Sequence, residues 1–132
     1  MLALLNAEGP RPAYEQLVSV APDVMSVGDV ELTIDIVEAA ACVLSGLGRA
    51  VDAATVLAAA DVSRESAGIP RSGPDQQHLD RHLAAARDAL GRADWEQGYA
   101  AGATMTPDQV VQWLSTPALA GAQSRPAADE EA

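Results

Sequence analysis

Apolar residues recur at intervals of three and four positions between residues 28 and 45, which is the spacing of one helix face. The members of this row are Val30, Ile34, Val37, Ala41 and Leu44. A second row widens the apolar face and consists of Ile36, Ala40, Val43 and Leu47. We therefore expect a helix that is buried on two sides.

Two glycines predict the end of this helix. Gly46 and Gly48 stand where a helix C-terminus favours a residue in the left-handed conformation. A second helix is predicted at once, over about residues 49–66. Its inward-facing residues are expected to be Val51, Ala54, Leu57, Ala58 and Val62. Two helices joined by so short a turn form an antiparallel αα-hairpin.

Three further helices are predicted in the C-terminal half. A loop rich in glycine and proline covers residues 68–74, and a helix follows at about 75–90, closed by Gly91. A short helix is expected at about 93–101. Thr106-Pro107-Asp108-Gln109 then has the pattern of an N-cap, an N1 proline and a capping-box glutamine, so it opens a last helix that Thr116-Pro117 ends.

The two ends of the chain carry weaker patterns. Residues 1–10 begin as if inside a helix and stop at Gly9-Pro10, and a short helix is expected over 12–20, ended at Ala21-Pro22-Asp23. Strand patterns are nearly absent. We therefore predict an all-α fold of five to six helices, arranged as antiparallel αα-hairpins in one domain over residues 1–116. Residues 117–132 are expected to form a disordered acidic tail.

Composition and charge exclude several function classes. The chain has 132 residues, with 19 acidic and eight basic side chains and a formal charge of -11. All eight basic residues are arginines spread from Arg11 to Arg125, whereas phosphate-rich partners need clustered cations. The sequence therefore disfavours direct nucleic-acid binding. The absence of lysine also excludes a phosphate-binding loop lysine and a Schiff-base lysine.

Cys42 is the single cysteine, so neither an intrachain disulfide nor a cysteine-based zinc site can form. Its apolar neighbours predict a buried, inert thiol. No targeting signal is evident, and charged residues and glycines interrupt the most apolar stretch, 36–60. We expect a cytoplasmic protein without a membrane contact.

Several segments resemble one family in an unbroken order over residues 29–115. Residues 49–68, RAVDAATVLAAADVSRESAG, and residues 79–91, LDRHLAAARDALG, are similar to its helical lines, and Trp95, Tyr99 and Gly102 fill its next positions. This segment closes the helical-repeat region of large bacterial signal-transduction ATPases, among them LuxR-family and antibiotic-regulatory transcriptional regulators and their cyclase-fused relatives. Asp61 and Ala58 depart from the pattern, which has glutamate and glycine there.

The resemblance implies a scaffold of repeats similar to tetratricopeptide (TPR) repeats, separate from the ATPase and DNA-binding domains of such regulators. We therefore expect a non-enzymatic protein-interaction module without catalytic residues, cofactor or metal. The exposed apolar end formed by Met1, Leu2, Leu4 and Leu5 predicts self-association, most simply as a homodimer.

Two groups of polar residues are candidates for reactive sites. His78 and His82 are four residues apart, with Asp75 one turn earlier, but the pattern lacks the glutamate of a zinc-protease helix, so exposed histidines are the better interpretation. A row of carboxylates recurs at helical spacing and is expected on a solvated edge, where it could dock an arginine-rich partner or a cation. It consists of Glu31, Asp35 and Glu38, and neutralising all three is expected to leave helicity intact.

Aromatic residues offer an alternative function. We expect Trp95, Tyr99, Met105 and Trp113 to form one plug where the C-terminal helices close against the 75–90 helix. A small-molecule sensor would bind its ligand between helices near Trp95, Tyr99 and Trp113. Two helix-spaced ion pairs are also expected, Arg64 with Asp61 and Arg92 with Asp88.

Overall fold

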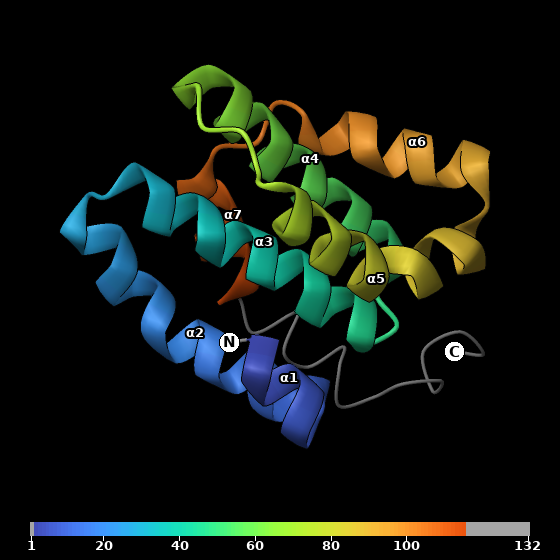
Figure 1. The fold of residues 1–132 in the computed structure, drawn as a ribbon, viewed down its shortest axis with the longest axis horizontal. Helices are drawn as coiled ribbons and strands as arrows, with labels where there is room; N and C mark the ends of the chain where they lie inside the picture. Colours follow the sequence, from blue (N-terminus) through green and yellow to red (C-terminus); the bar gives the residue numbers. More distant parts are fainter. Residues whose placement is uncertain (1, 116–132) are drawn as a thin grey trace.

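The computed structural model describes the backbone of residues 2–115 and the side chains of residues 5–115 (Figure 1). This part of the chain forms seven helices and no strand, which confirms the all-α class. Their bounds are α1 (Leu2–Glu8), α2 (Pro10–Val27), α3 (Val30–Gly46), α4 (Ala50–Ala67), α5 (Gly73–Leu90), α6 (Arg92–Gly102) and α7 (Pro107–Leu114). Seven rather than five to six helices occur because both N-terminal segments are helical. The tail predicted over 117–132 and the stop at Thr116-Pro117 lie outside the described residues.

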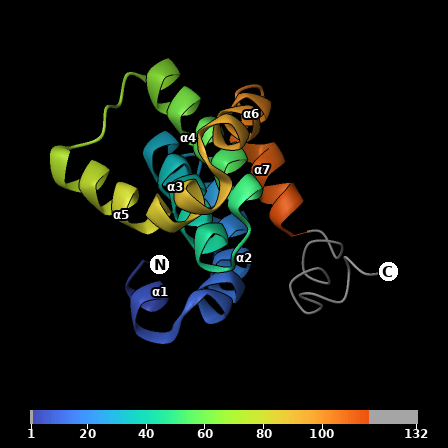
Figure 2. The ribbon, with the colours of Figure 1, turned by 90° about the vertical axis from the view of Figure 1, so that its right-hand side faces the viewer.

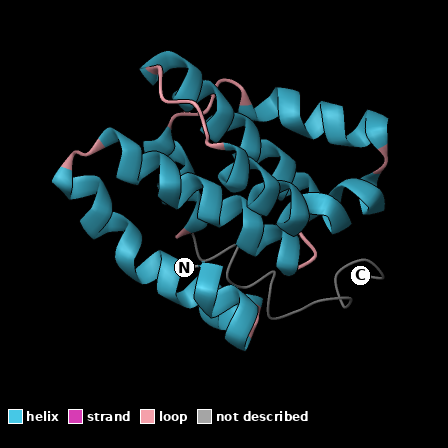
Figure 3. Cartoon of the chain, viewed as in Figure 1, coloured by secondary structure: helices cyan, strands magenta, loops and turns pink. Residues whose placement is uncertain are grey.

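Helix α3 is the centre of the structure. Among the described helices it contacts all except α6, and the turns that join them are short (Figures 1 and 3). Both of its predicted apolar rows are buried along its middle, including Val37, Ala40 and Val43, which have no exposed surface. The predicted hairpin is confirmed, since α3 packs most extensively against α4 and Gly48 adopts a left-handed φ of 79° in the turn between them. None of the described helices is sufficiently long and apolar to cross a membrane.

Helix α2 is longer than predicted, because it continues through Pro22 and ends only at Gly28. The expected stop at Ala21-Pro22-Asp23 is therefore wrong. A proline inside a helix removes one backbone hydrogen bond. Leu17 and Ala21 are buried before that point, Val24 and Met25 after it are partly buried against the core, and this packing holds the helix together.

The N-terminal end is partly covered by the chain itself. Helix α1 contacts α2 and α3, and Leu5 packs half-buried against the core. Pro10 and Leu5 approach Gly46 so closely that a methyl group there would lie 3.0 Å from the Pro10 Cβ atom and 3.4 Å from a Leu5 methyl carbon. The side chains of Met1, Leu2 and Leu4 lie outside the described residues, so the self-association surface remains a prediction.

Helix α6 lies against α4 through two glycines spaced four residues apart. A Cβ atom at Gly98 would lie 3.3 Å from the Ala54 Cβ atom and from the Val51 carbonyl oxygen, and one at Gly102 would overlap the Thr55 backbone. The Thr55 hydroxyl donates to the Gly98 carbonyl at 2.9 Å. The two helix axes can therefore approach only because these positions have no side chain.

Helix α7 turns back toward the start of the chain. Its predicted capping box is confirmed, with the Thr106 hydroxyl accepting from the Gln109 amide and the Gln109 side chain accepting from the Thr106 amide. The helix contacts α2, α3 and α4, and the buried Tyr14 hydroxyl of α2 donates to the Leu114 carbonyl at 2.5 Å. Figure 2 shows α5 and α7 on opposite sides of the α3–α4 pair.

The close approach of α6 and α4 yields a stability prediction. Gly102→Ala is expected to lower the free energy of unfolding by roughly 1–3 kcal/mol or more, because the added methyl group forces the two backbones apart. Gly73→Ala is the matched control, since a methyl group there meets no atom within 4 Å and Gly73 lies in the first turn of α5. Urea unfolding followed by circular dichroism measures both, and equal values for the two variants would contradict the packing described.

Candidate functional site

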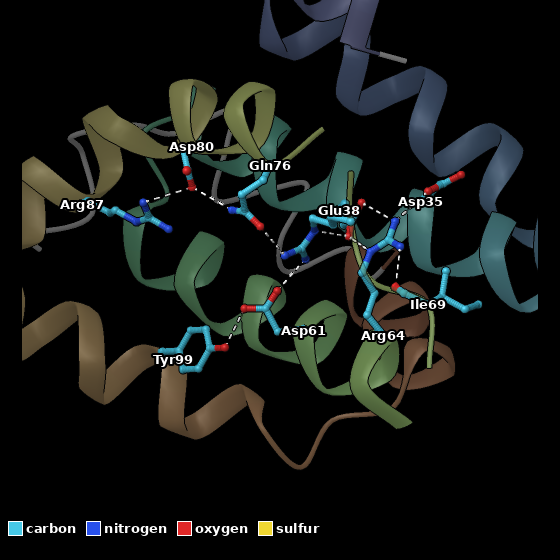
Figure 4. Close-up of polar contacts among 10 residues, drawn as sticks. Asp35, Glu38, Asp61, Arg64, Ile69, Gln76, Asp80, Arg87 and Tyr99 are labelled. Carbon is cyan, nitrogen blue, oxygen red and sulfur yellow. Dashed lines mark hydrogen bonds and ion pairs between the residues drawn. The ribbon is translucent and has the colours of Figure 1, made fainter. Parts of the chain in front are cut away.

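Two regions gather side chains that could bind or react. The first is a cluster of charged residues between α3, α4 and the loop that joins α4 to α5 (Figure 4). The second is an apolar groove at the corner where α2 meets α3. The two regions differ in how fully their polar groups are already bonded within the chain.

Glu38 is the acceptor at the centre of the charged cluster. It extends from α3 and accepts hydrogen bonds from Arg64 on α4, including one from Nη2 at 3.1 Å. It also accepts from Arg71 Nε in the α4–α5 loop at 2.6 Å. The three side chains are between 9% and 15% exposed, so a single carboxylate is paired with two largely buried guanidinium groups.

The other nitrogen atoms of the two guanidinium groups also donate hydrogen bonds. Arg64 donates to the Ile69 carbonyl at 2.9 Å and to Asp35 at 3.2 Å. Arg71 donates to Asp61 at 2.5 Å and to Gln76 at 3.2 Å. A cavity of about 480 Å³ lies beside this loop. Every guanidinium nitrogen of the pair donates at least one hydrogen bond within the chain, so the cluster holds the loop against α3.

The cluster extends toward α6 along two routes. Tyr99 donates its hydroxyl hydrogen to Asp61 at 2.6 Å, and burial together with this bond raises the pKa of Tyr99 to about 12. On the other route, Asp80 accepts from Gln76 at 2.9 Å and from Arg87 at 3.5 Å. The Arg87 guanidinium lies 5.1 Å from the centre of the Trp95 ring, a cation–π contact.

The predicted helix-spaced ion pairs are wrong. Arg64 pairs with Glu38 and Asp35 of the neighbouring helix, and Asp61 pairs instead with Arg71. Arg92 pairs with Glu96, four residues later, at 3.3 Å, and not with Asp88. The Arg64 side chain is only 9% exposed, so it lies toward α3, where carboxylates offset its desolvation.

The predicted solvated row of carboxylates is correct at one end only. Glu31 is exposed and the Asp35 side chain is 54% exposed, whereas the Glu38 side chain is 15% exposed. The three residues do share a helix face, but the loop anchored by Arg71 covers the face only at Glu38. Arginines of the chain itself, Arg64 and Arg71, pair with Asp35 and Glu38 of this row.

The Asp35 carboxyl is in an unfavourable place for a charge. Desolvation raises its pKa above the ordinary value of 3.8, and the charge of Glu38 raises it further, while Arg64 lowers it. The negative charges of Glu31 and Asp75 act in the same direction as Glu38. The proton is thus held more tightly by the folded protein than by the unfolded chain.

The two histidines do not face a common site. His78 lines a cavity of about 350 Å³ between α3 and α5, together with Asp35, Glu38, Cys42 and Asp75. His82 lies elsewhere, with Nδ1 at 2.8 Å from the His78 carbonyl and Nε2 at 3.1 Å from the Asn6 side chain. Within the described chain no three such ligands are placed to hold a metal ion.

The thiol in this cavity wall is unreactive. Cys42 is 1% exposed, which confirms the predicted burial. Desolvation raises the pKa of the Cys42 thiol to about 12, with a further contribution from the charge of Glu38. Because the thiolate is the nucleophilic form, this cysteine carries no reactive group at neutral pH.

The predicted aromatic plug is wrong as a single unit. Trp95 and Tyr99 lie on α6, which packs on α4 and α5, while Trp113 lies on α7, which packs on α2, α3 and α4. The described parts of α6 and α7 make no contact with each other, because the segment over 103–106 carries the chain to the other side of α4 (Figure 2). Trp95, Tyr99 and Trp113 line neither the cavities beside the charged cluster nor the apolar groove.

The apolar groove has a volume of about 680 Å³ and is open to solvent. Its walls are the α2–α3 corner, the C-terminal end of α4 and the segment that leads into α7. The lining residues include Met25, Val30, Ile34, Val62, Met105 and Pro107. The side chain of Val30 is 54% exposed and that of the neighbouring Val27 is 68% exposed. From here on we call this region the corner groove.

Sequence patterns did not identify the corner groove. Val30 and Val51 were expected to face inward, yet both are about half exposed. Each lies in the first turn of its helix, and Val51 lies beside Gly98 of α6. An apolar residue at the end of a periodic row was the only signal of the groove. No protein-family model, curated protein or solved structure matches the chain.

The charged cluster predicts a large effect of one neutral substitution. Glu38→Gln is expected to lower the free energy of unfolding by roughly 2–4 kcal/mol, because two largely buried guanidinium groups lose their shared counter-charge. Glu31→Gln, on the same helix but exposed and without an ion pair, is the control and is expected within about 0.5 kcal/mol of the wild type. Denaturant unfolding compares the two, and a similar value for both would remove the structural role assigned to Glu38.

Neutralising Asp35 is expected to stabilise the protein, in contrast to Glu38→Gln, and by an amount that depends on pH. Because its pKa is raised, ionisation of Asp35 opposes folding, and stability is lost as the pH rises from 3.8 through the raised pKa. Asp35→Asn is therefore expected to raise the free energy of unfolding at about pH 7, and the gain should vanish as the pH falls to the ordinary value. Urea titrations of both proteins along the pH scale check this, and a less stable variant at neutral pH would show that the bond to Arg64 outweighs the repulsion.

Proposed function

We propose that this chain is a non-enzymatic helical-repeat interaction module that binds a segment of another protein in the corner groove. The resemblance to the repeat region of bacterial signal-transduction ATPases supports a regulatory, cytoplasmic setting and a TPR-like origin of the hairpins. The ATPase and DNA-binding activities of those regulators belong to segments with other motifs. The module acts by binding alone.

The state of the charged residues supports this proposal. A catalytic site needs acids, bases or nucleophiles that are free to exchange protons with a substrate. Here Glu38, Asp61, Arg64 and Arg71 are engaged with one another, and the Cys42 thiol is buried. These groups fix the positions of α3, α4 and the loop, and they offer a substrate little to react with.

The observation that carries the proposal is the corner groove itself. Exposed apolar side chains normally occur singly, whereas contiguous apolar surface marks a place where something binds. Val27 and Val30 adjoin a hollow floored by Met25, Ile34 and Met105. The groove is open to solvent, which suits a polypeptide segment better than a metabolite that needs an enclosed cavity. Trp95, Tyr99 and Trp113, the residues of the alternative ligand site, do not line this groove.

Site-specific crosslinking tests the proposal. A photoreactive amino acid in place of Val30 is expected to give a discrete covalent adduct with one protein in cells of the source organism. The same amino acid in place of Val51 is the control, because Val51 has nearly the same exposure, 51% against 54%, and lies in the first turn of α4 outside the groove. Adducts of equal yield and mass from both positions, or none from Val30, would contradict the proposal.

A further inference from the structure

We propose that the corner groove binds an amphipathic helix whose apolar stripe is flanked by basic side chains. This inference rests on the proposed function and adds the chemistry of the partner. It comes from three features of the groove: its apolar floor, the charges around it and the kind of structure that forms its walls.

The floor is apolar and adaptable. Two of the chain's three methionines, Met25 and Met105, line it from opposite walls, together with Val30, Ile34 and Val62. Methionine side chains are flexible and polarisable, and they recur on surfaces that accept the apolar faces of varied helices. Burying an apolar stripe here would therefore provide the main attraction.

The charges around the floor have one sign. The one carboxylate residue that lines the groove is Asp108, and Asp29 and Glu31 adjoin the lining residues Gly28 and Val30 along the chain. The one arginine within two residues of the lining is Arg64. Arg64 is buried and paired with Glu38 and Asp35, and Asp61 is paired with Arg71. Asp29, Glu31 and Asp108, which we call the acidic rim, have no ion pair in the described structure.

Acidic residues without an ion pair beside the groove repel partners that are themselves acidic. A second copy of this chain would bring the same rim and a formal charge of -11 toward its own kind, and the chain's last residues, Asp129, Glu130 and Glu131, are acidic as well. A partner with lysine or arginine beside its apolar stripe gains attraction from the rim and would associate faster at low salt. Charge complementarity thus favours a basic partner.

The walls favour a helix over an extended strand. A strand binds mainly by adding to an exposed sheet edge, and the described chain has no sheet. The groove is bounded by the ends of α2 and α4 and the starts of α3 and α7, and its lining includes the apolar side chains of Met25, Val30 and Met105. An amphipathic helix docks in such a groove through apolar residues three and four positions apart.

Synthetic helices test the inference directly. Two peptides of about 18 residues, five helical turns, carry the same leucine stripe, flanked in one by lysine and arginine and in the other by glutamate. Fluorescence anisotropy measures their binding to the full chain at about 50 and 300 mM salt. The basic peptide is expected to bind at least about tenfold more tightly than the acidic one, and more weakly at the higher salt.

A pair of variants separates groove binding from general attraction to an acidic protein. Val30→Lys and Val51→Lys change the net charge equally and replace valines of similar exposure, but only Val30 lines the groove. Val30→Lys is expected to weaken the basic peptide at least about tenfold, whereas Val51→Lys stays near the wild-type value. Thermal unfolding of both variants confirms that they are folded.

Each other outcome overturns a distinct statement. Equal weakening by the two variants means that the basic peptide binds by charge alone and not in the groove, which overturns the inference. Equal binding of the acidic and basic peptides, both weakened by Val30→Lys, overturns the basic partner while the proposed function stands. Binding of neither peptide overturns the inference, and the Val30 crosslink then decides the proposed function separately. A dimer in light scattering that Val30→Lys dissociates would assign the groove to a second copy.

Discussion

Glu38 accepts hydrogen bonds from two guanidinium groups, and much of the structure depends on that arrangement. Arg64 and Arg71 are largely desolvated, so each needs a carboxylate close by. Because Arg64 comes from α4 and Arg71 from the loop after it, one side chain on α3 fixes the relative positions of both. Asp61 accepts hydrogen bonds from both Arg71 and Tyr99, and so links the loop to α6. The charged cluster therefore belongs to the framework that positions α3, α4 and the α4–α5 loop.

The corner groove is a consequence of this framework and of two close contacts. The hydroxyl of Tyr14 holds the end of α7 against α2, so the segment that leads into α7 reaches the α2–α3 corner. Gly98 and Gly102 let α6 lie directly on α4, which determines where that segment begins. The groove is thus bounded by parts that are each anchored elsewhere, and its shape is available before a partner binds.

Local signals in the sequence predicted much of the fold. The α3 periodicity, the left-handed glycine at Gly48 and the capping box at Thr106 depend on residues within one or two turns, and all three features are present in the structure. The path of α2 through Pro22 was not predicted, because long-range packing of Leu17 and Ala21 outweighs the local effect of a proline.

The candidate site depended on distant residues and was harder to predict. Arg64 pairs with Glu38 because its side chain is buried against α3. Helical spacing within α4 gives no information about this burial. The aromatic residues were close in sequence, yet the turn before α7 separates them in space. The exposure of Val30 was not predictable either, since periodicity identifies a helix face but not how far neighbouring helices cover it.

Chemical-shift mapping on the full chain tests the division between framework and binding surface most directly. Titration with the basic helical peptide should move the amide signals of Val30, Ser66 and Met105, which line the three walls of the groove. The Nε–H signals of Arg64 and Arg71 should stay in place, because their bonds to Glu38 belong to the framework. Shifts centred on Arg64, Arg71 and the loop between α4 and α5, with the groove signals unchanged, would contradict the account and assign binding to the charged cluster.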